Sequence, residues 1–385
     1  MTGVKSLIYL DNAATTYPKP YETLKEYDDC ITNYAANAGR GGHKMSIKAA
    51  EKIFQTRQIV SSLFNIPTPE NVAFTGNATM AINMGLKGIA TQGKSVIISS
   101  MEHNSVYRPL TELSKYGVKT VIADADEYGF VSPGAIEEKI SDHTALICIT
   151  HASNVTGAVN NIRKVGEIAR RHKIVFMVDC AQSAGSTDID VVRDNIDILA
   201  FPGHKGLFGM QGTGGIYVRE GINLKTIIEG GTGSLSESDV QPSFMPDMLE
   251  SGTLNLPGIA SLYGGISYVL KRGVKDIREH EERLAAALYE RLSAMRKIKI
   301  ISPFPKEGNT HLVTVVAEGI DSAQFAAVLD KKYNIAVRAG LHCSYLGSRS
   351  MGVLETGCIR FSPGAFNTMA DINKTAAAVH DICSY

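Results

Sequence analysis

The chain has 385 residues, of which 44% are hydrophobic and 20% are charged, and its 39 Lys and Arg balance its 39 Asp and Glu. This composition is typical of an ordinary globular protein, and the length suggests two domains. Because there is no basic excess and no apolar run approaches about 18 residues, we expect neither a nucleic-acid partner nor a membrane span.

The chain begins with Met-Thr-Gly-Val-Lys, which lacks the apolar core of a signal peptide, so we expect a cytoplasmic protein. Its six cysteines are widely spaced, and none forms a C-x-x-C pair. In a long cytosolic chain this spacing favours free thiols over disulfides and gives no reason to expect a zinc or other metal site.

Strand-like and helix-like apolar patterns alternate through the first 200 residues. The predicted strands cover 7–10, 71–75, 95–100, 119–123, 144–150, 174–179 and 197–201. The predicted helices cover 21–34, 45–64, 80–90, 104–115 and 162–172. Such alternation predicts an α/β fold with a mainly parallel sheet covered by helices on both faces.

The pattern changes over 219–257, which is rich in Gly and contains several prolines, and a second block follows. In this block we predict a long helix at 272–296, strands at 311–317, 335–338 and 358–362, and helices at 321–333 and 368–382. We therefore expect three parts. They are an N-terminal arm (1–20) packing with the small domain, a large domain (21–258) and a smaller α+β domain (259–385).

Lys205 lies in a turn directly after the predicted strand 197–201, and a glycine-dense run, 206–215, follows it. Glycine-rich backbone at a strand end allows a ligand to approach closely, so Lys205 is placed to meet one. Taken alone, it is equally typical of a solvated loop lysine.

Two more strand ends carry suggestive residues. Ala78 and Thr79 lie between a strand and a helix, where helix-start amides and a hydroxyl can bind an anion. Asp179 ends the strand 174–179, at the sheet edge where α/β proteins bind ligands. Each is also explained as a simple helix cap.

His103 and Asn154 follow two further predicted strands. The imidazole could stack on a planar ligand, and the amide could donate to a carboxylate. Alone, each is more typical of a structural histidine and of a turn asparagine.

Together, these strand ends supply an anion cup, a stacking ring, an amide, an acid and a lysine. Pyridoxal 5'-phosphate (PLP) requires such a set, because it needs a lysine for covalent attachment, an acid at its ring nitrogen and a site for its phosphate. Five coincidental placements are less plausible than one shared ligand, so we predict a PLP site.

At this point the chain resembles the class V aminotransferases, which are fold type I PLP enzymes, and among them the cysteine desulfurases. The matching segments span nearly the whole chain, and their full set in this order is specific although no single segment is. They are YLDNAAT (9–15), EHNS (102–105), VDCAQ (178–182), GHK (203–205), SGT (251–253) and RAGLHC (338–343).

The resemblance implies roles for the cofactor-binding residues. Lys205 would hold PLP covalently and move protons, Asp179 would pair with the ring nitrogen, and Gln182 would donate to the ring oxygen. His103 and Ala181 would contact the two ring faces. The phosphate would be held by Ala78, Thr79, His204 and, from a neighbouring subunit, Thr253, which implies a homodimer.

The resemblance also implies a substrate, L-cysteine or a close analogue, whose carboxylate Asn154 and Arg360 would bind. Cys343 would take the sulfur as a persulfide for delivery to an acceptor protein, and Arg338 and His342 nearby would favour its thiolate; Arg338 would also contact the substrate. Selenocysteine lyase, another class V enzyme and a non-catalytic scaffold remain as alternatives.

The chain departs from the family pattern in three places. Pro202 replaces a Ser or Thr whose hydroxyl usually contacts the phosphate, and Leu341 replaces a frequent second histidine. The segment 344–352 is atypical and adds Arg349. These changes leave PLP binding as the prediction but leave the substrate and the sulfur acceptor open.

Overall fold

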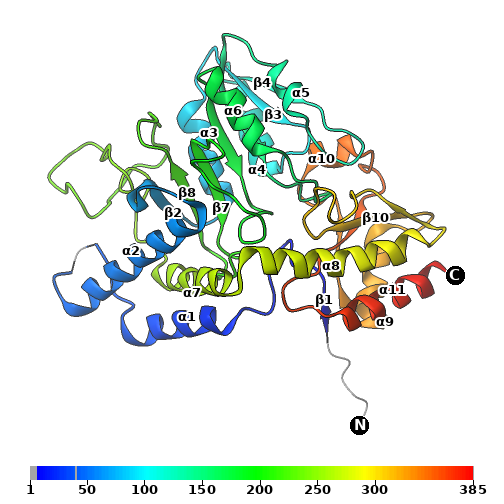
Figure 1. Ribbon diagram of the computed structural model, residues 1–385. Helices are drawn as coiled ribbons and strands as arrows, with labels where there is room; N and C mark the ends of the chain where they lie inside the picture. Colours follow the sequence, from blue (N-terminus) through cyan, green and yellow to red (C-terminus); the bar gives the residue numbers. More distant parts are fainter. Residues whose placement is uncertain (1–6, 40, 385) are drawn as a thin grey trace.

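The computed structural model describes residues 7–39 and 41–384, and a seven-stranded sheet forms its centre (Figure 1). The strand order is β2-β8-β7-β6-β5-β3-β4. The strands are β2 (Val72–Thr75), β3 (Ser95–Ser99), β4 (Lys119–Ala123), β5 (Thr144–Thr150), β6 (Val175–Asp179), β7 (Ile198–Pro202) and β8 (Gly214–Val218). From β7 to β4 all neighbours are parallel, while β8 is antiparallel to both β7 and β2. The α/β prediction is confirmed.

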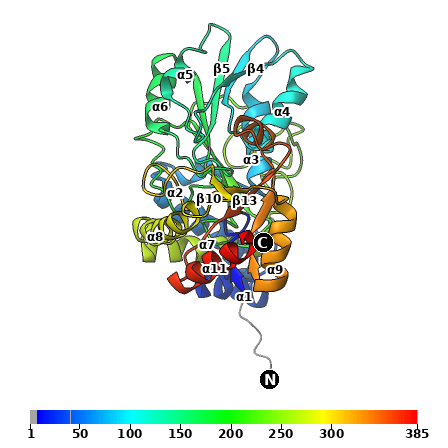
Figure 2. The ribbon, with the colours of Figure 1, turned by 90° about the vertical axis from the view of Figure 1, so that its right-hand side faces the viewer.

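Helices cover both faces of this sheet, as Figure 2 shows for α3 and α4 on one side and α5 and α6 on the other. Along β3 the side chains alternate: Ile97 enters one core, whereas Val96 and Ile98 enter the other. Both sides of the strand are buried, which accounts for its unbroken apolar sequence. The helices of this region are α1 (Tyr21–Asn33), α2 (Lys44–Phe64), α3 (Ala78–Ile89), α4 (Asn104–Ser114), α5 (Pro133–Glu137), α6 (Ile162–Arg171) and the short 3-10 turn η1 (Pro69–Asn71).

The C-terminal part is built on a four-stranded antiparallel sheet of order β12-β13-β10-β9. Its strands are β9 (Ile298–Ile300), β10 (Val313–Ala317), β12 (Arg338–Gly340) and β13 (Cys358–Phe361), and α9 (Ser322–Tyr333) and α11 (Met369–Cys383) accompany them. The N-terminal strand β1 (Ile8–Tyr9) pairs with β11 (Ile335–Ala336), and Ile8 and Leu10 join the hydrophobic core of this part.

Two regions after residue 250 contain helices that differ from the predicted ones. The helix expected at 272–296 is α8 (Val274–Ser293), and a separate helix, α7 (Leu256–Arg272), precedes it and packs on α1 and α2. Gly273 separates the two helices with a φ of +91°, a conformation that glycine adopts readily. The segment after Cys343, for which we predicted no helix, contains α10 (Tyr345–Ser350). No helix in the described parts of the chain is both long enough and apolar enough to cross a membrane.

Candidate functional site

A cavity of about 200 Å³ opens at the carboxyl ends of β5, β6 and β7, next to the first turns of α3 and α4. Parallel strands bring their carboxyl ends to one edge of the sheet, which is why residues from distant parts of the sequence meet there. Nine of the predicted site residues line this cavity: Ala78, Thr79, His103, Asn154, Asp179, Ala181, Gln182, His204 and Lys205.

Lys205 and Asp179 both face this cavity and influence each other's charge. Burial lowers the pKa of Lys205 to about 8, although Asp179 partly offsets this shift. Burial raises the pKa of Asp179 above its ordinary value, while a hydrogen bond of 2.9 Å from the Ala181 amide and the charge of Lys205 act in the opposite direction. The lowered pKa of Lys205 agrees with the prediction of an amine that moves protons near neutral pH.

The two cavity histidines are neutral near pH 7, because burial and the charge of Lys205 lower the pKa of His103 and of His204 to about 4. Nδ1 of His103 accepts a hydrogen bond of 3.0 Å from the Ser105 amide, which fixes the ring at the start of α4. Nδ1 of His204 lies 3.1 Å from the hydroxyl of Thr15. Among the described residues, the hydrogen bonds of both rings involve Nδ1 and not Nε2.

The first turn of α3 supplies the predicted anion site. Asn77 caps the helix by accepting a hydrogen bond from the Met80 amide, so Ala78 and Thr79 begin a twelve-residue helix at the cavity wall. Unpaired amides and the helix dipole favour a negative group there. Pro202 also lines the cavity, so the hydroxyl that relatives place at this position is replaced by an apolar ring.

Cys343, Arg338 and Arg360 lie outside the cavity lining, but their charges reach it. Cys343 is exposed, and its Sγ is 3.0 Å from Nη2 of Arg338. Together with Arg360, Arg338 lowers the pKa of Lys205, whereas Cys343 raises it; both effects are smaller than that of burial. The other five cysteines are buried or half-buried and free, as predicted.

His342 differs from the prediction. Its ring is buried, and burial and the charges of Arg360 and Arg338 lower its pKa to about 3. A neutral imidazole adds no positive charge beside Cys343, so Arg338 alone of the two supplies it.

Arg360 is almost completely buried and lies beside Arg338, its partner across β12 and β13. Its Nη1 donates to the Asn154 carbonyl (2.7 Å) and its Nη2 contacts Asp11 (3.2 Å). Its Nε has no hydrogen-bond partner among the described residues. An unsatisfied buried guanidinium nitrogen is expected to receive an acceptor such as a carboxylate.

Two predicted donors are already engaged within the chain. The side-chain amide of Asn154 donates to the His342 carbonyl (2.6 Å), and that of Gln182 donates to the Ala13 carbonyl (3.1 Å). Each NH₂ group has a second hydrogen, so these bonds orient the side chains without exhausting them.

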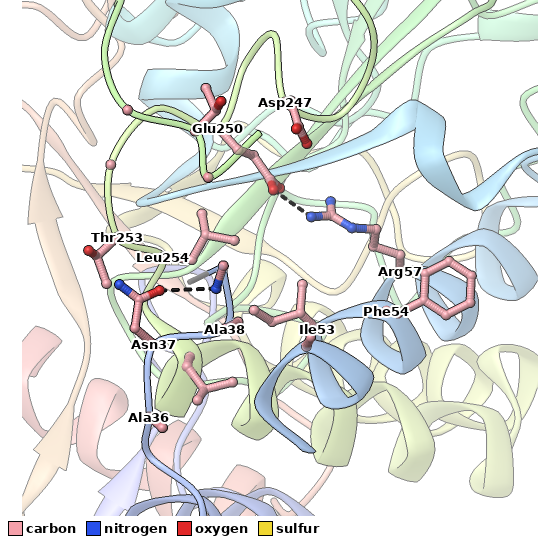
Figure 3. Close-up of a pocket in the computed structure, with 17 residues that line it drawn as sticks. Ala36, Asn37, Ala38, Ile53, Phe54, Arg57, Asp247, Glu250, Thr253 and Leu254 are labelled. Carbon is pink, nitrogen blue, oxygen red and sulfur yellow. Dashed lines mark hydrogen bonds and ion pairs between the residues drawn. The ribbon is translucent and has the colours of Figure 1, made fainter. Parts of the chain in front are cut away.

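Thr253 does not reach the cofactor cavity of its own chain. It lines a separate cavity of about 480 Å³ between α2 and the loops at 36–39 and 231–254 (Figure 3). There a buried ion pair joins Arg57 and Glu250 at 2.5 Å. The role of Thr253 in the site of a second subunit, which the resemblance implies, stays a prediction.

The sequence did not single out Thr16, Lys19 or Asn104. The side chains of Thr16 and Lys19 fix the backbone next to Lys205, because both donate to the His204 carbonyl (3.2 and 2.7 Å). For Thr16 and Lys19, the only sequence signal was their place in the Pro-rich segment after the predicted strand 7–10. For Asn104, it was its place in the matching segment EHNS (102–105).

The arrangement fits PLP at three separate points. The start of α3 could bind its phosphate, and the buried carboxyl of Asp179 could pair with its ring nitrogen. The amine of Lys205 lines the same cavity, where it could attach the cofactor covalently. His103 and Ala181, which line the cavity as well, are available to contact its ring.

Several known proteins are similar to this chain in sequence and in fold. The family described as Aminotransferase class-V matches residues 8–375. A probable cysteine desulfurase of Methanothermobacter thermautotrophicus is 31% identical over 97% of this chain and 94% of its own length. The cysteine desulfurase IscS of Buchnera aphidicola is 29% identical over 98% and 93%. The apo structure of a cysteine desulfurase from Thermococcus onnurineus superposes with a TM-score of 0.92 at 28% identity, covering 98% of this chain and 95% of that one.

Proposed function

The chain belongs to the class V aminotransferase family, and we propose that it is a PLP-dependent cysteine desulfurase, which converts L-cysteine to L-alanine and carries the sulfur on Cys343. One observation carries the proposal: an exposed thiol, 3.0 Å from the Arg338 guanidinium, lies close enough to the cofactor cavity to influence Lys205. A transaminase has no use for such a thiol.

Bound PLP supplies an electron sink that makes the Cα proton of an amino acid acidic. Asp179 would hold the proton on the ring nitrogen, and the start of α3 would anchor the phosphate. Lys205, whose pKa burial lowers to about 8, would take the Cα proton and return it later. His103 stays neutral and can contact the ring without adding a competing positive charge.

The substrate carboxylate would bind between Arg360 and Arg338, which are paired across β12 and β13. Nε of Arg360, which has no partner among the described residues, would donate to it, and Asn154 lines the adjoining cavity. A carboxylate at this place directs the substrate sulfur toward Cys343, which follows β12 by three residues.

In the sulfur step, the Cys343 thiolate attacks the sulfur of the substrate and forms an S–S bond. The Cβ–S bond breaks, its electron pair goes to carbon, and protonation of the carbon gives alanine. One sulfur atom moves from cysteine to Cys343, so the step balances without an external oxidant or reductant. Arg338 would stabilise the thiolate before attack.

We further propose that two copies form a homodimer and that a protein thiol accepts the sulfur from the exposed Cys343. Thr253 would complete the phosphate site of the partner chain, compensating for Pro202. Apolar side chains are exposed on α2 (Ile47 and Phe54) and in the loop beyond β8 (Val240 and Phe244), where a second copy would cover them. Sedimentation of the purified protein as a monomer at micromolar concentration would exclude this dimer.

The test of the function is replacement of Cys343 by Ser, with Cys383→Ser as the matched control. Wild type and control should release alanine and sulfide from L-cysteine in the presence of a reductant, and Cys343→Ser should lose at least 100-fold in rate. Its visible cofactor absorbance should be unchanged. Alanine formation by Cys343→Ser at the wild-type rate would reject the assignment, and a parallel assay with selenocysteine identifies the preferred chalcogen.

A further inference from the structure

The segment that carries Cys343 is joined directly to the segment that carries His103. The Asn104 amide donates to the Cys343 carbonyl (2.9 Å), and the Tyr345 amide donates to Oδ1 of the Asn104 side chain (3.1 Å). The Ser344 hydroxyl donates to the Glu102 carbonyl (3.0 Å). Asn104 therefore binds the backbone on both sides of Ser344, and its neighbour His103 lines the cofactor cavity.

The backbone at Cys343 needs such support. His342 and Cys343 have φ values of +50° and +57°, a left-handed conformation that residues other than glycine rarely adopt, and here two occur in succession. Strained backbone of this kind persists only where surrounding contacts hold it. On the His342 side the contact is the hydrogen bond from the Asn154 side chain, and on the Cys343 side it is the backbone amide of Asn104. The Asn104 side chain adds a second contact two residues further on, where it accepts from the Tyr345 amide.

The helix that follows is fixed to the same support. Leu346 of α10 is buried in the core beneath α3 and α4, and the ring of Tyr345 stacks on Tyr107 of α4 with centroids 6.2 Å apart. The loop is thus held at both ends by α4, while the Cys343 side chain itself stays exposed.

We propose that Asn104 is a positioning residue for the sulfur step: by accepting from the Tyr345 amide, its side chain fixes the segment of Cys343 relative to His103 and the cofactor cavity. This inference rests on the proposed function. Attack on the substrate sulfur requires the thiolate at a defined distance and angle, and a displacement of about 1 Å can reduce a rate by roughly 100-fold. Proton removal by Lys205 requires no bond to Cys343, and the charge of Cys343 is the smallest of the named influences on the pKa of Lys205, so this step should change little.

The experiment compares Asn104→Ala with wild type on two substrates. L-Cysteine requires attack by Cys343, whereas 3-chloro-L-alanine loses chloride once its Cα proton is removed and needs no thiol. We expect kcat with cysteine to fall 10- to 100-fold, with KM and the rate of chloroalanine elimination changed less than threefold. Hydrogen exchange of a peptide covering 341–347 should become faster, because the Tyr345 amide loses its acceptor.

Two further variants complete the test. Asn104→Asp keeps an acceptor oxygen for the Tyr345 amide, at a helix start that favours an acidic residue, and should restore most of the rate. Asn161→Ala likewise removes an asparagine side chain that accepts one backbone amide hydrogen bond, here from Lys164 at the start of α6 and away from the site, and should leave both rates unchanged. Parallel loss of both activities in Asn104→Ala, or an unchanged cysteine rate, would overturn the inference. A wild-type enzyme that eliminates chloride but makes no alanine from cysteine would instead reject the desulfurase function.

Discussion

At the scale of single residues, the chemistry of the site depends on how burial changes ordinary side chains. The base that we propose at Lys205 depends on burial, which lowers the pKa of its amine to about 8, while Asp179 and the two arginines adjust this pKa. Burial likewise lowers the pKa of His342 to about 3, so Arg338, whose Nη2 lies 3.0 Å from Sγ of Cys343, is the positive group beside that thiol. Neither effect can be inferred from the residue type alone.

The Lys205 shift predicts selective reactivity of the cofactor-free enzyme toward small aldehydes. At pH 8 about half of an amine with a pKa of about 8 is uncharged, against well under 1% at the ordinary value of about 10.4. Reductive methylation by formaldehyde should therefore modify Lys205 at pH 8, before the exposed Lys115, whose pKa Glu112 raises. Peptide mass mapping across pH 7–11 measures both residues, and equal rates at pH 8 would contradict the shift.

At the scale of elements, close backbone contacts set the distance between the strand ends. A Cβ on Gly206 would lie 2.2 Å from the Ala184 carbonyl oxygen, and a Cβ on Gly185 would lie 2.1 Å from the Gly206 carbonyl oxygen. The segment after β6, which carries Asp179 at its start, thus touches the segment after β7, which carries Lys205. Only glycine at both positions permits this approach.

Replacing Gly206 with Ala should force these two segments apart. Overpacking of this kind costs about 1–3 kcal/mol in the free energy of unfolding, and we expect at least tenfold weaker PLP binding because Lys205 moves away from Asp179. Gly134→Ala is the control, since a Cβ there meets only the Ser132 hydroxyl, at 3.9 Å, in the surface helix α5. Titration of the cofactor absorbance measures binding, and a Gly206→Ala protein with wild-type affinity would show that the contact is unimportant.

The sequence predicted the elements whose apolar pattern is regular and missed those that depend on contacts with distant segments. Apolar periodicity located β3, β5, β6, α4 and α6 within one or two residues, because both faces of the sheet are buried. It did not predict the five-residue helix α5. Periodicity placed the start of α8 beside Gly273 but did not reveal α7, the helix that precedes it. It also missed α10, whose six residues are held by contacts with α4 rather than by their own pattern.

The site was predictable to a similar degree. Strand ends of a parallel sheet converge, so nine predicted residues could be placed in one cavity from chain order and family resemblance. The internal partners of Asn154, Gln182 and Arg360 were not predictable, because they depend on how the C-terminal sheet and the N-terminal arm pack against the large sheet.

At the scale of the whole molecule, buried titratable groups of opposite type make stability depend on pH in opposing ways. Burial lowers the pKa of His151 to about 4, so protonation below the ordinary value of 6.5 favours the unfolded chain. Burial raises the pKa of Glu102 to about 8, so this carboxyl destabilises the folded chain increasingly as the pH rises from 4.5 toward 8. The free energy of unfolding of wild type, measured against pH, therefore contains the contributions of several groups and cannot be assigned to one of them.

Comparison of wild type with His151→Gln isolates one contribution. His151 is buried beside the end of β5, where the charge of Asp194 raises its pKa and those of Arg278 and Arg193 lower it, all less than burial does. Above pH 6.5 the imidazole is neutral in the folded and the unfolded chain and contributes no pH dependence. As the pH falls from 6.5 to about 4, the free energy of unfolding of wild type decreases on the order of 3 kcal/mol, because each pKa unit corresponds to about 1.4 kcal/mol. The glutamine cannot titrate, so the variant should gain stability relative to wild type over this interval. Denaturant unfolding at pH 7.5, 6, 5 and 4.5 measures the difference, and a constant difference would mean that His151 is not held neutral by burial.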